Sequence, residues 1–132
     1  MNETRIPIER ESDIVVARQA GRQLAAANGF SMTDQTLIAT AISEVARNIV
    51  VYALKGEIIV SRVEDGTRVG IQVVASDAGP GIENLDMAMR DGYSTKNSLG
   101  LGLPGARRLM DDFHLTSEIG HGTTVTMKKW RR

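Results

Sequence analysis

The chain has 132 residues, which fits a single domain over 1–132 and is long enough to bury a core without staples. It contains no cysteine, which excludes disulfides, thiolate zinc sites and thiol catalysis. Sixteen basic and sixteen acidic side chains balance, so no net field favours nucleic acid or an anionic membrane surface. No signal peptide and no run near the ~20 apolar residues of a membrane span is found, so we expect a cytoplasmic protein.

The N-terminal half predicts one strand followed by two helices. Residues 3–9 alternate weakly, as a strand does. Apolar residues then repeat at helical spacing over 14–25, with Ser12 as the expected N-cap. A longer helix follows, capped by Thr33, with an apolar stripe over 37–53.

Two polar residues flank the apolar stripe of the second helix. Glu44 and Asn48 are four residues apart and therefore share one helix face. A carboxylate can accept a proton and an amide oxygen can bind Mg²⁺, although an isolated pair of this kind more often faces solvent. Arg47 lies between them as a surface charge or a partner contact, a choice that the sequence leaves open.

A β-hairpin over 57–63 and 68–76 delivers a carboxylate to a glycine-rich turn. Asp77 ends the second arm and is followed by Gly79 and Gly81. A carboxylate at the end of a buried strand is costly unless a group donates to it, and an adenine amino group is one such donor. The alternative is an Asp-Gly turn satisfied by its own backbone.

The remaining elements complete an α+β pattern. A short helix is expected over 83–90, a mobile polar loop over 91–99, a helix over 103–113 and a strand pair over 115–119 and 123–130. Strands joined by turns, with helices at irregular intervals, favour a two-layer α/β sandwich over a doubly wound parallel sheet.

Gly100, Gly102 and Gly105 have the G-x-G-x-x-G spacing, which is weak by itself. The dinucleotide-binding version must follow a buried strand, but the polar residues 94–98 precede it here. The eukaryotic-type kinase version requires His-Arg-Asp and Asp-Phe-Gly motifs, which the chain lacks. What remains is a glycine turn leading into a helix, where free N–H groups suit phosphate.

Two other features carry little functional signal. His114 and His121 are the two histidines, and their spacing does not suit a zinc site. The basic tail 128–132 is interpreted as the solvated end of the last strand in preference to a nucleic-acid contact.

Four motifs in order resemble the N, G1, G2 and G3 boxes of the GHKL superfamily of ATPases and kinases: Glu44-x-x-x-Asn48, Asp77-x-Gly79-x-Gly81, Gly100-x-Gly102 and Gly120-x-Gly122-Thr123. The resemblance implies the Bergerat fold, with a mixed, mainly antiparallel sheet covered on one face by helices. It also implies an ATP site with Mg²⁺.

The resemblance implies a role for each matching residue. Glu44 would act as the catalytic base and Asn48 as the Mg²⁺ ligand, while Asp77 would recognise adenine. Ser94, Thr95 and Lys96 lie in the segment that would form the ATP lid, and no family pattern fixes them. The implied cofactor-binding residues are Asn48, Asp77, Gly79, Gly81, Ser94, Thr95, Lys96, Gly100, Leu101, Gly102 and Thr123.

Within the superfamily, residues 42–49, 91–95 and 100–111 resemble the RsbT-like switch kinases of the bacterial stressosome. That branch implies phosphorylation of serine or threonine on a small STAS-domain partner (RsbS/RsbR-like), followed by dissociation and activation of a phosphatase (RsbU-like). A phosphatase co-activator with a dispensable nucleotide site is a further reading, disfavoured by the intact Glu44.

The alternative branch contains anti-sigma factors of the RsbW and SpoIIAB type, which bind a sigma factor and phosphorylate its antagonist. Their N box usually carries Asn-Ala and a downstream histidine. Ile49 follows Asn48 here, and Tyr52 stands where that histidine would be. These departures favour the switch-kinase branch.

Overall fold

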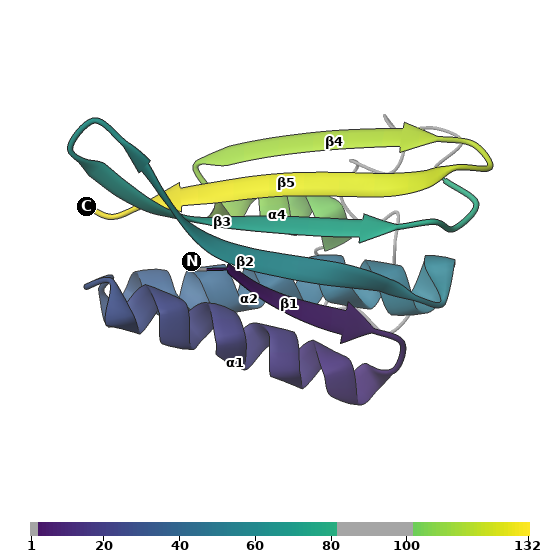
Figure 1. Cartoon of the computed structure of the whole chain (residues 1–132), viewed down its shortest axis with the longest axis horizontal. Coiled ribbons are helices and arrows are strands. Elements are labelled where there is room, and N and C mark those ends of the chain that lie inside the picture. Colours follow the sequence, from purple (N-terminus) through teal and green to yellow (C-terminus); the bar gives the residue numbers. More distant parts are fainter. Residues whose placement is uncertain (1–2, 82–101) are drawn as a thin grey trace.

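The structure is a computed structural model that describes residues 3–81 and 102–132. It is a two-layer α+β sandwich, in which helices pack against one face of a single sheet (Figure 1). The N-terminal part contributes β1 (Glu3–Ile8), α1 (Glu11–Ala27), α2 (Met32–Asn48) and the π-helical segment η1 (Ile49–Ala53). The remainder contributes β2 (Gly56–Asp65), β3 (Arg68–Asp77), α4 (Gly102–Leu109), β4 (Asp112–Glu118) and β5 (Gly122–Trp130).

The sheet is five-stranded, in the order β1-β2-β3-β5-β4, and its described pairings are all antiparallel. The predicted two-layer sandwich is confirmed. Val73 and Ala75 of β3 are buried against the helices. Because side chains alternate along a strand, Asp77 at the end of β3 points to the same side. Its neighbours across the sheet are Gly56 in β2 and Thr123 in β5.

α2 occupies the middle of the helix layer, between α1 and α4 (Figure 1). Residues 41–46 of α2 are all buried. Gly21 of α1 permits close packing, because a Cβ there would lie 2.1 Å from Cδ1 of Ile42. A polar side chain in this part of α2 therefore lies inside the protein and not on its surface.

The N-caps of both N-terminal helices differ from the predicted ones. α1 begins before Ser12, because the Asp13 carboxylate accepts the backbone N–H of Arg10 at 3.1 Å. α2 is capped by the hydroxyl of Ser31, not by Thr33. The apolar periodicity located both helices, and each predicted N-cap was wrong by two positions.

The helix predicted over 103–113 is shorter in the structure. α4 ends at Leu109, and β4 begins at Asp112. The backbone N–H of Asp111 donates to the Lys128 carbonyl oxygen at 2.9 Å, which brings the chain to the edge of β5. A tertiary hydrogen bond therefore ends this helix.

The basic tail was predicted to be the solvated end of the last strand, and this prediction is wrong for Lys129 and Trp130. Both residues are buried, with exposed fractions of 5% and 8%. The Lys129 ammonium donates to the Leu109 carbonyl oxygen at 2.9 Å, and the Trp130 backbone N–H donates to the Asp111 carboxylate at 2.7 Å. The tail fastens the C-terminal end of α4 to β5.

One helical run, Met32–Ala53, is long and apolar enough to cross a membrane, by length and composition only. No run of that kind was expected from the sequence. This helical run consists of α2 and η1, and 50% of its most apolar window is buried inside the fold. Its position between α1, α4 and the sheet accounts for the apolar composition.

Candidate functional site

The loop after β3 and the β4–β5 hairpin meet at one end of the sheet (Figure 1). A Cβ on Gly81 would lie 2.6 Å from the Glu118 carbonyl oxygen, and a Cβ on Gly122 would lie 2.0 Å from the Asp77 carbonyl oxygen. Both glycines have positive φ, at 81° and 110°. These close approaches need glycine and hold the end of β3 against the hairpin.

The Asp77 carboxylate is tied to both neighbouring segments. Its Oδ1 accepts the backbone N–H of Gly79 at 2.9 Å and that of Thr123 at 3.3 Å. The first bond is the backbone-satisfied turn that the sequence left open as an alternative. Within residues 3–81 and 102–132, the hydrogen bonds to this carboxylate all go to Oδ1. The second oxygen makes no hydrogen bond within that part of the chain.

Thr123 is buried beside Asp77, with 6% of its surface exposed. Its hydroxyl lies 2.9 Å from Oγ of Ser117, which also donates to the Gly122 carbonyl oxygen at 3.2 Å. Ser117 was not among the residues predicted for the site. Strand alternation in 112–118 could have placed it on the helix-facing side of β4.

Glu44 lies in the interior of the protein. Its position on the flank of the apolar stripe had suggested a place at the surface. Its exposed fraction is 2%, and its Oε1 is inaccessible and has no hydrogen-bond partner among the residues that the structure describes. A buried carboxylate oxygen without a partner is costly to a fold, and such groups cluster at functional sites. Glu44 is the strongest functional candidate in the described part of the chain.

Burial raises the pKa of Glu44 above its ordinary value. The positive charge of Arg47 opposes this shift and lowers the pKa, as does the backbone N–H of Gly102, which hydrogen-bonds to the carboxylate. Gly102 is buried, is the first residue of α4 and has a φ of 54°. The N-terminal end of α4 therefore supports negative charge on Glu44.

Asn48 is the last residue of α2, one turn beyond Glu44, and is half-buried. Among the described residues, no group of three or more His, Cys, Asp or Glu side chains could hold a metal ion. Mg²⁺ commonly takes one or two protein oxygens and completes its shell with waters and phosphates. The single amide oxygen of Asn48 fits a Mg²⁺ that arrives with a nucleotide.

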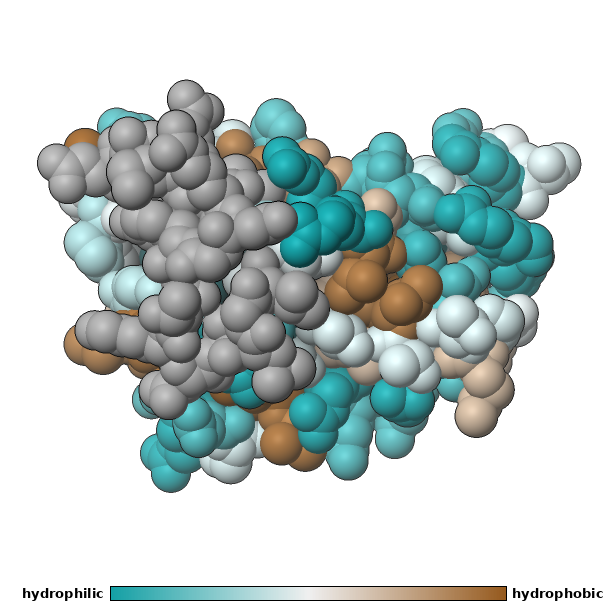
Figure 2. Space-filling view, turned by 180° about the vertical axis from the view of Figure 1, so that it is seen from behind, coloured by the Kyte–Doolittle hydropathy of each residue, from teal (hydrophilic) through white to brown (hydrophobic). Residues whose placement is uncertain are grey.

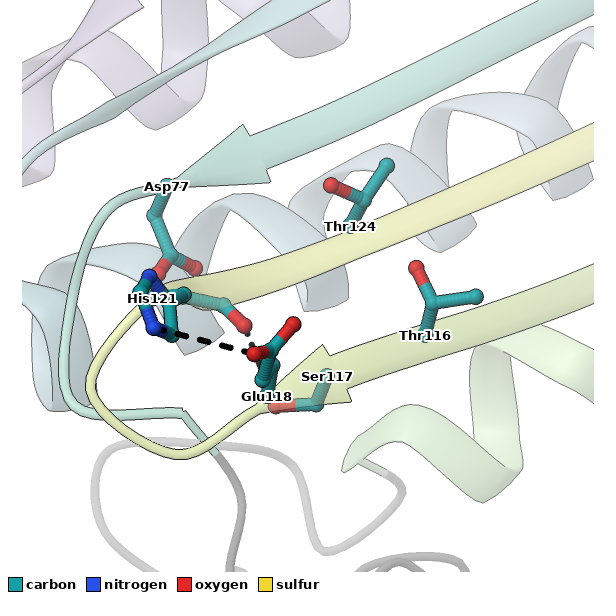
Figure 3. A pocket seen from close by; sticks show the side chains of 7 residues that line it. Asp77, Thr116, Ser117, Glu118, His121 and Thr124 are labelled. Atoms are coloured by element: carbon teal, nitrogen blue, oxygen red, sulfur yellow. Dashed lines mark hydrogen bonds and ion pairs between the residues drawn. The ribbon is translucent and has the colours of Figure 1, made fainter.

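A shallow hollow of about 250 Å³ opens beside the β4–β5 hairpin (Figure 3). Thr116 and Thr124, paired across β4 and β5, contribute to its lining, and Glu118 and His121 lie 3.6 Å apart at its margin. Thr116 and Thr124 alternate with Ser117 and Thr123, so they point away from the helix layer. Asp77, Ser117 and Gly122 also line the hollow, so it reaches the end of β3 beside the Asp77–Thr123 contact.

The structure brings together two groups of the predicted residues. Asp77, Gly79, Gly81 and Thr123 meet at the end of the sheet, and Glu44 meets Gly102 where α2 packs on α4. The predicted helix over 83–90 and loop over 91–99 lie outside the described residues. So do five predicted cofactor-binding residues: Ser94, Thr95, Lys96, Gly100 and Leu101.

Sequence comparison identifies the family. Residues 7–129 match the family described as histidine kinase-like ATPase domain. The chain is 50% identical over 127 residues to the serine/threonine-protein kinase RsbT of Bacillus subtilis (strain 168), with 96% of each chain covered. It is 30% identical over 103 residues to an anti-sigma F factor of Clostridium kluyveri (strain NBRC 12016), covering 75% of this chain and 72% of that one.

Solved structures share the fold at low sequence identity. The RsbU and RsbW domains of Rv1364c from Mycobacterium tuberculosis match with a TM-score of 0.67 and 20% identity, over 100% of this chain and 33% of that one. The SiaB–SiaC complex of Pseudomonas aeruginosa matches with a TM-score of 0.58 and 17% identity, covering 97% and 88%. The chain belongs to the histidine kinase-like ATPase (GHKL) family, and within that family it is an RsbT-like protein.

Proposed function

We propose that this RsbT-like chain is a cytoplasmic serine/threonine kinase, formed by residues 1–132 as one domain. It transfers the γ-phosphoryl group of Mg-ATP to a small STAS-domain protein, then leaves that complex and activates a phosphatase. The burial of Glu44, whose Oε1 has no partner in the described part of the chain, is the observation that carries the proposal. The 50% identity to a serine/threonine-protein kinase supports the reaction class.

Adenine recognition is assigned to the end of β3. The Oδ2 of Asp77 accepts the adenine amino group, while Oδ1 stays tied to Gly79 and Thr123. Gly79 and Gly81 let the backbone lie close to the purine, and Thr123 assists through a water. Gly100, Leu101 and Gly102, with Ser94, Thr95 and Lys96, are the proposed contacts to the phosphates.

Phosphoryl transfer is assigned to the N-terminal end of α4 and the adjoining turn of α2. Asn48 offers its amide oxygen to Mg²⁺, which supplies charge neutralisation of the phosphates. Glu44 accepts the proton of the partner's hydroxyl as that oxygen bonds to the γ-phosphorus and ADP departs. Burial raises the pKa of Glu44, which suits a group that accepts a proton, and Arg47 and the Gly102 N–H partly oppose that rise by favouring the charged form.

The STAS-domain partner (RsbS/RsbR-like) and the phosphatase (RsbU-like) are proposed on the basis of the similarity to RsbT. The related fold in the SiaB–SiaC structure occurs in a complex with a second protein, which supports partner binding by this scaffold. The new phosphate would carry nearly two negative charges close to Glu44 and Asp77, and the repulsion would release the kinase.

A second candidate is an anti-sigma factor, favoured by the 30% identity to an anti-sigma F factor over 75% of the chain. The two functions are separated by one assay. The protein and Mg-ATP are incubated with the STAS-domain proteins and, separately, with the sigma factors of its own organism, and phosphorylation and complex formation are followed. A phosphorylated STAS protein without a sigma-factor complex supports the switch kinase, and a stable sigma-factor complex supports the alternative.

A further inference from the structure

We propose that an apolar rim at the Asp77 end of the molecule is the docking surface for the folded protein that receives the phosphate. The rim consists of Tyr52, Leu54, Ala78, Pro80 and Ile119. The inference deepens the proposed function and rests on it, because it names the surface by which the kinase holds its substrate.

The rim exposes large apolar side chains to solvent. Leu54 is 75% exposed, Ile119 66% and Tyr52 42%, and Ala78 and Pro80 are exposed between them. Seen from behind, small hydrophobic areas reach the outline of the molecule beside the grey segment (Figure 2). Contiguous exposed apolar surface on a soluble domain marks an interaction site more often than scattered single residues do.

The three segments that carry the rim are in contact with one another. A Cβ on Gly79 would lie 2.6 Å from Cβ of Ala53, so the loop after β3 lies against the end of η1. The Pro80 carbonyl oxygen accepts the backbone N–H of Gly120 at 2.9 Å, next to Ile119. The loop that follows Asp77 therefore connects Leu54 on one side with Ile119 on the other.

Leu54 is held in an unfavourable conformation without an offsetting burial of its side chain. Its φ of 74° and ψ of −37° lie near the strained classical γ-turn, and it is the one non-glycine residue with positive φ in the described part of the chain. Its backbone N–H closes η1 by donating to the Ile49 carbonyl oxygen at 2.9 Å, a bond that glycine would also make. Neither burial nor backbone geometry accounts for leucine, whereas contact with a partner does.

The position of the rim identifies the occupant. Leu54 follows Asn48 by six residues, at the end of η1, and Ala78 and Pro80 follow Asp77 within three residues. A protein seated on the rim thus brings its hydroxyl group to the end where Mg-ATP is proposed to bind. Exposed Lys55, Glu118 and His121 border the apolar side chains, as polar residues surround the centre of a specific interface.

The test compares rim variants with a matched control. Leu54→Gly and Ile119→Ser remove rim side chains, and Met32→Ser removes an equally exposed apolar side chain (75%) at the opposite end of the same helical run. Each variant is assayed with Mg-ATP and each purified STAS-domain protein of the organism. Binding of Mg-ATP is measured by calorimetry, and Tm by circular dichroism.

Both rim variants should lower kcat/KM for phosphorylation of the partner by about tenfold or more, while the Kd for Mg-ATP and the activity of Met32→Ser stay at wild-type values. Leu54→Gly should keep or raise Tm, because it relieves backbone strain. A fall in activity caused only by unfolding would lower Tm as well and would count against the rim. Wild-type kcat/KM in both rim variants overturns this inference alone. A wild-type protein that phosphorylates none of the STAS proteins overturns the proposed function, and the rim with it.

Discussion

Asp77 illustrates how one side chain combines a structural and a proposed binding role. Its Oδ1 joins two segments through the N–H groups of Gly79 and Thr123, which leaves Oδ2 for the ligand. Asp77→Asn should abolish measurable ATP binding, because an amide can present its NH₂ group to the adenine amino group, which is itself a donor. Such a mismatch in a buried site costs several kcal/mol, on the order of 10⁴-fold in affinity. Calorimetry with Asp65→Asn as an exposed control checks this, and wild-type affinity in Asp77→Asn would reject the adenine assignment.

Glu44 carries the proposed chemistry. Glu44→Gln should still bind Mg-ATP, since the change is isosteric, while phosphoryl transfer falls by about 10²–10⁴-fold through loss of the base. Single-turnover transfer to the partner, measured beside ATP affinity, separates the two effects. Transfer at the wild-type rate would show that another group accepts the proton.

The same substitution makes a prediction about stability. Because burial raises the pKa of Glu44 in the folded state, folding favours the protonated form and ionisation opposes it. Glu44→Gln should therefore unfold less readily than wild type at neutral and alkaline pH. The difference should shrink as pH falls through the raised pKa and vanish below the ordinary value for glutamate. Urea unfolding across pH measures this, and a difference that grows toward acid pH has the wrong sign.

Two features of the site could be predicted from the sequence: the shared helix face of Glu44 and Asn48, and the turn after Asp77. Both depend on helix periodicity and glycine placement, which are local properties. The burial of Glu44 could not be predicted from the sequence. It depends on the packing of α4 against α2, and no pattern within α2 reports that contact. Strand alternation could have placed Ser117 on the helix-facing side of β4, but its contact with Thr123 crosses between two strands and was not predictable from either strand alone.

At the scale of elements, the β4–β5 hairpin positions the end of β3. Gly122→Ala should destabilise the protein by roughly 3 kcal/mol or more and weaken ATP binding, because its Cβ would collide with the Asp77 carbonyl oxygen. Gly120→Ala is the matched control: its φ is also positive, at 82°, but no atom lies within 4 Å of the added Cβ. It should cost only the backbone strain, about 1 kcal/mol. Equal losses in the two variants would argue against the contact.

The C-terminal tail fastens α4. Burial by itself would raise the pKa of Asp111, but hydrogen bonds from the Trp130 backbone N–H and Arg132 and the charge of Lys129 lower it overall. The stabilisation is present above the ordinary pKa and is lost as pH falls through the lowered one. Asp111→Asn should cost about 1–2 kcal/mol at neutral pH, and the difference should disappear in acid. A loss independent of pH would assign the effect to packing alone.

Helix and strand identities were predictable where apolar periodicity extended over many residues, as in α1, α2 and the β2–β3 hairpin. The ends of the helices and strands were less predictable. The N-caps of α1 and α2 were each misplaced by two positions, because neighbouring polar residues compete for the same role. α4 was predicted to run to 113, because the hydrogen bond from Asp111 to Lys128 that ends it is tertiary.

At the scale of the whole molecule, the α+β sandwich followed from strands joined by tight turns. Strand order did not, since β5 lies between β3 and β4 and only packing determines that arrangement. The sandwich brings together two groups of residues from distant parts of the sequence. Glu44 and Gly102 meet in the helix layer, and Asp77 and Thr123 meet in the sheet. An acceptor protein docked on the apolar rim would approach both.

The central claim is that Glu44 makes this domain a protein kinase acting in trans. The most direct measurement is intact mass spectrometry of a STAS-domain protein of the same organism after incubation with Mg-ATP and either wild-type protein or Glu44→Gln. The account predicts a gain of one phosphate on a serine or threonine of the STAS protein with wild type, and almost none with Glu44→Gln at equal ATP occupancy. Phosphate on a histidine of this chain, or equal phosphorylation of the partner by both proteins, would contradict it.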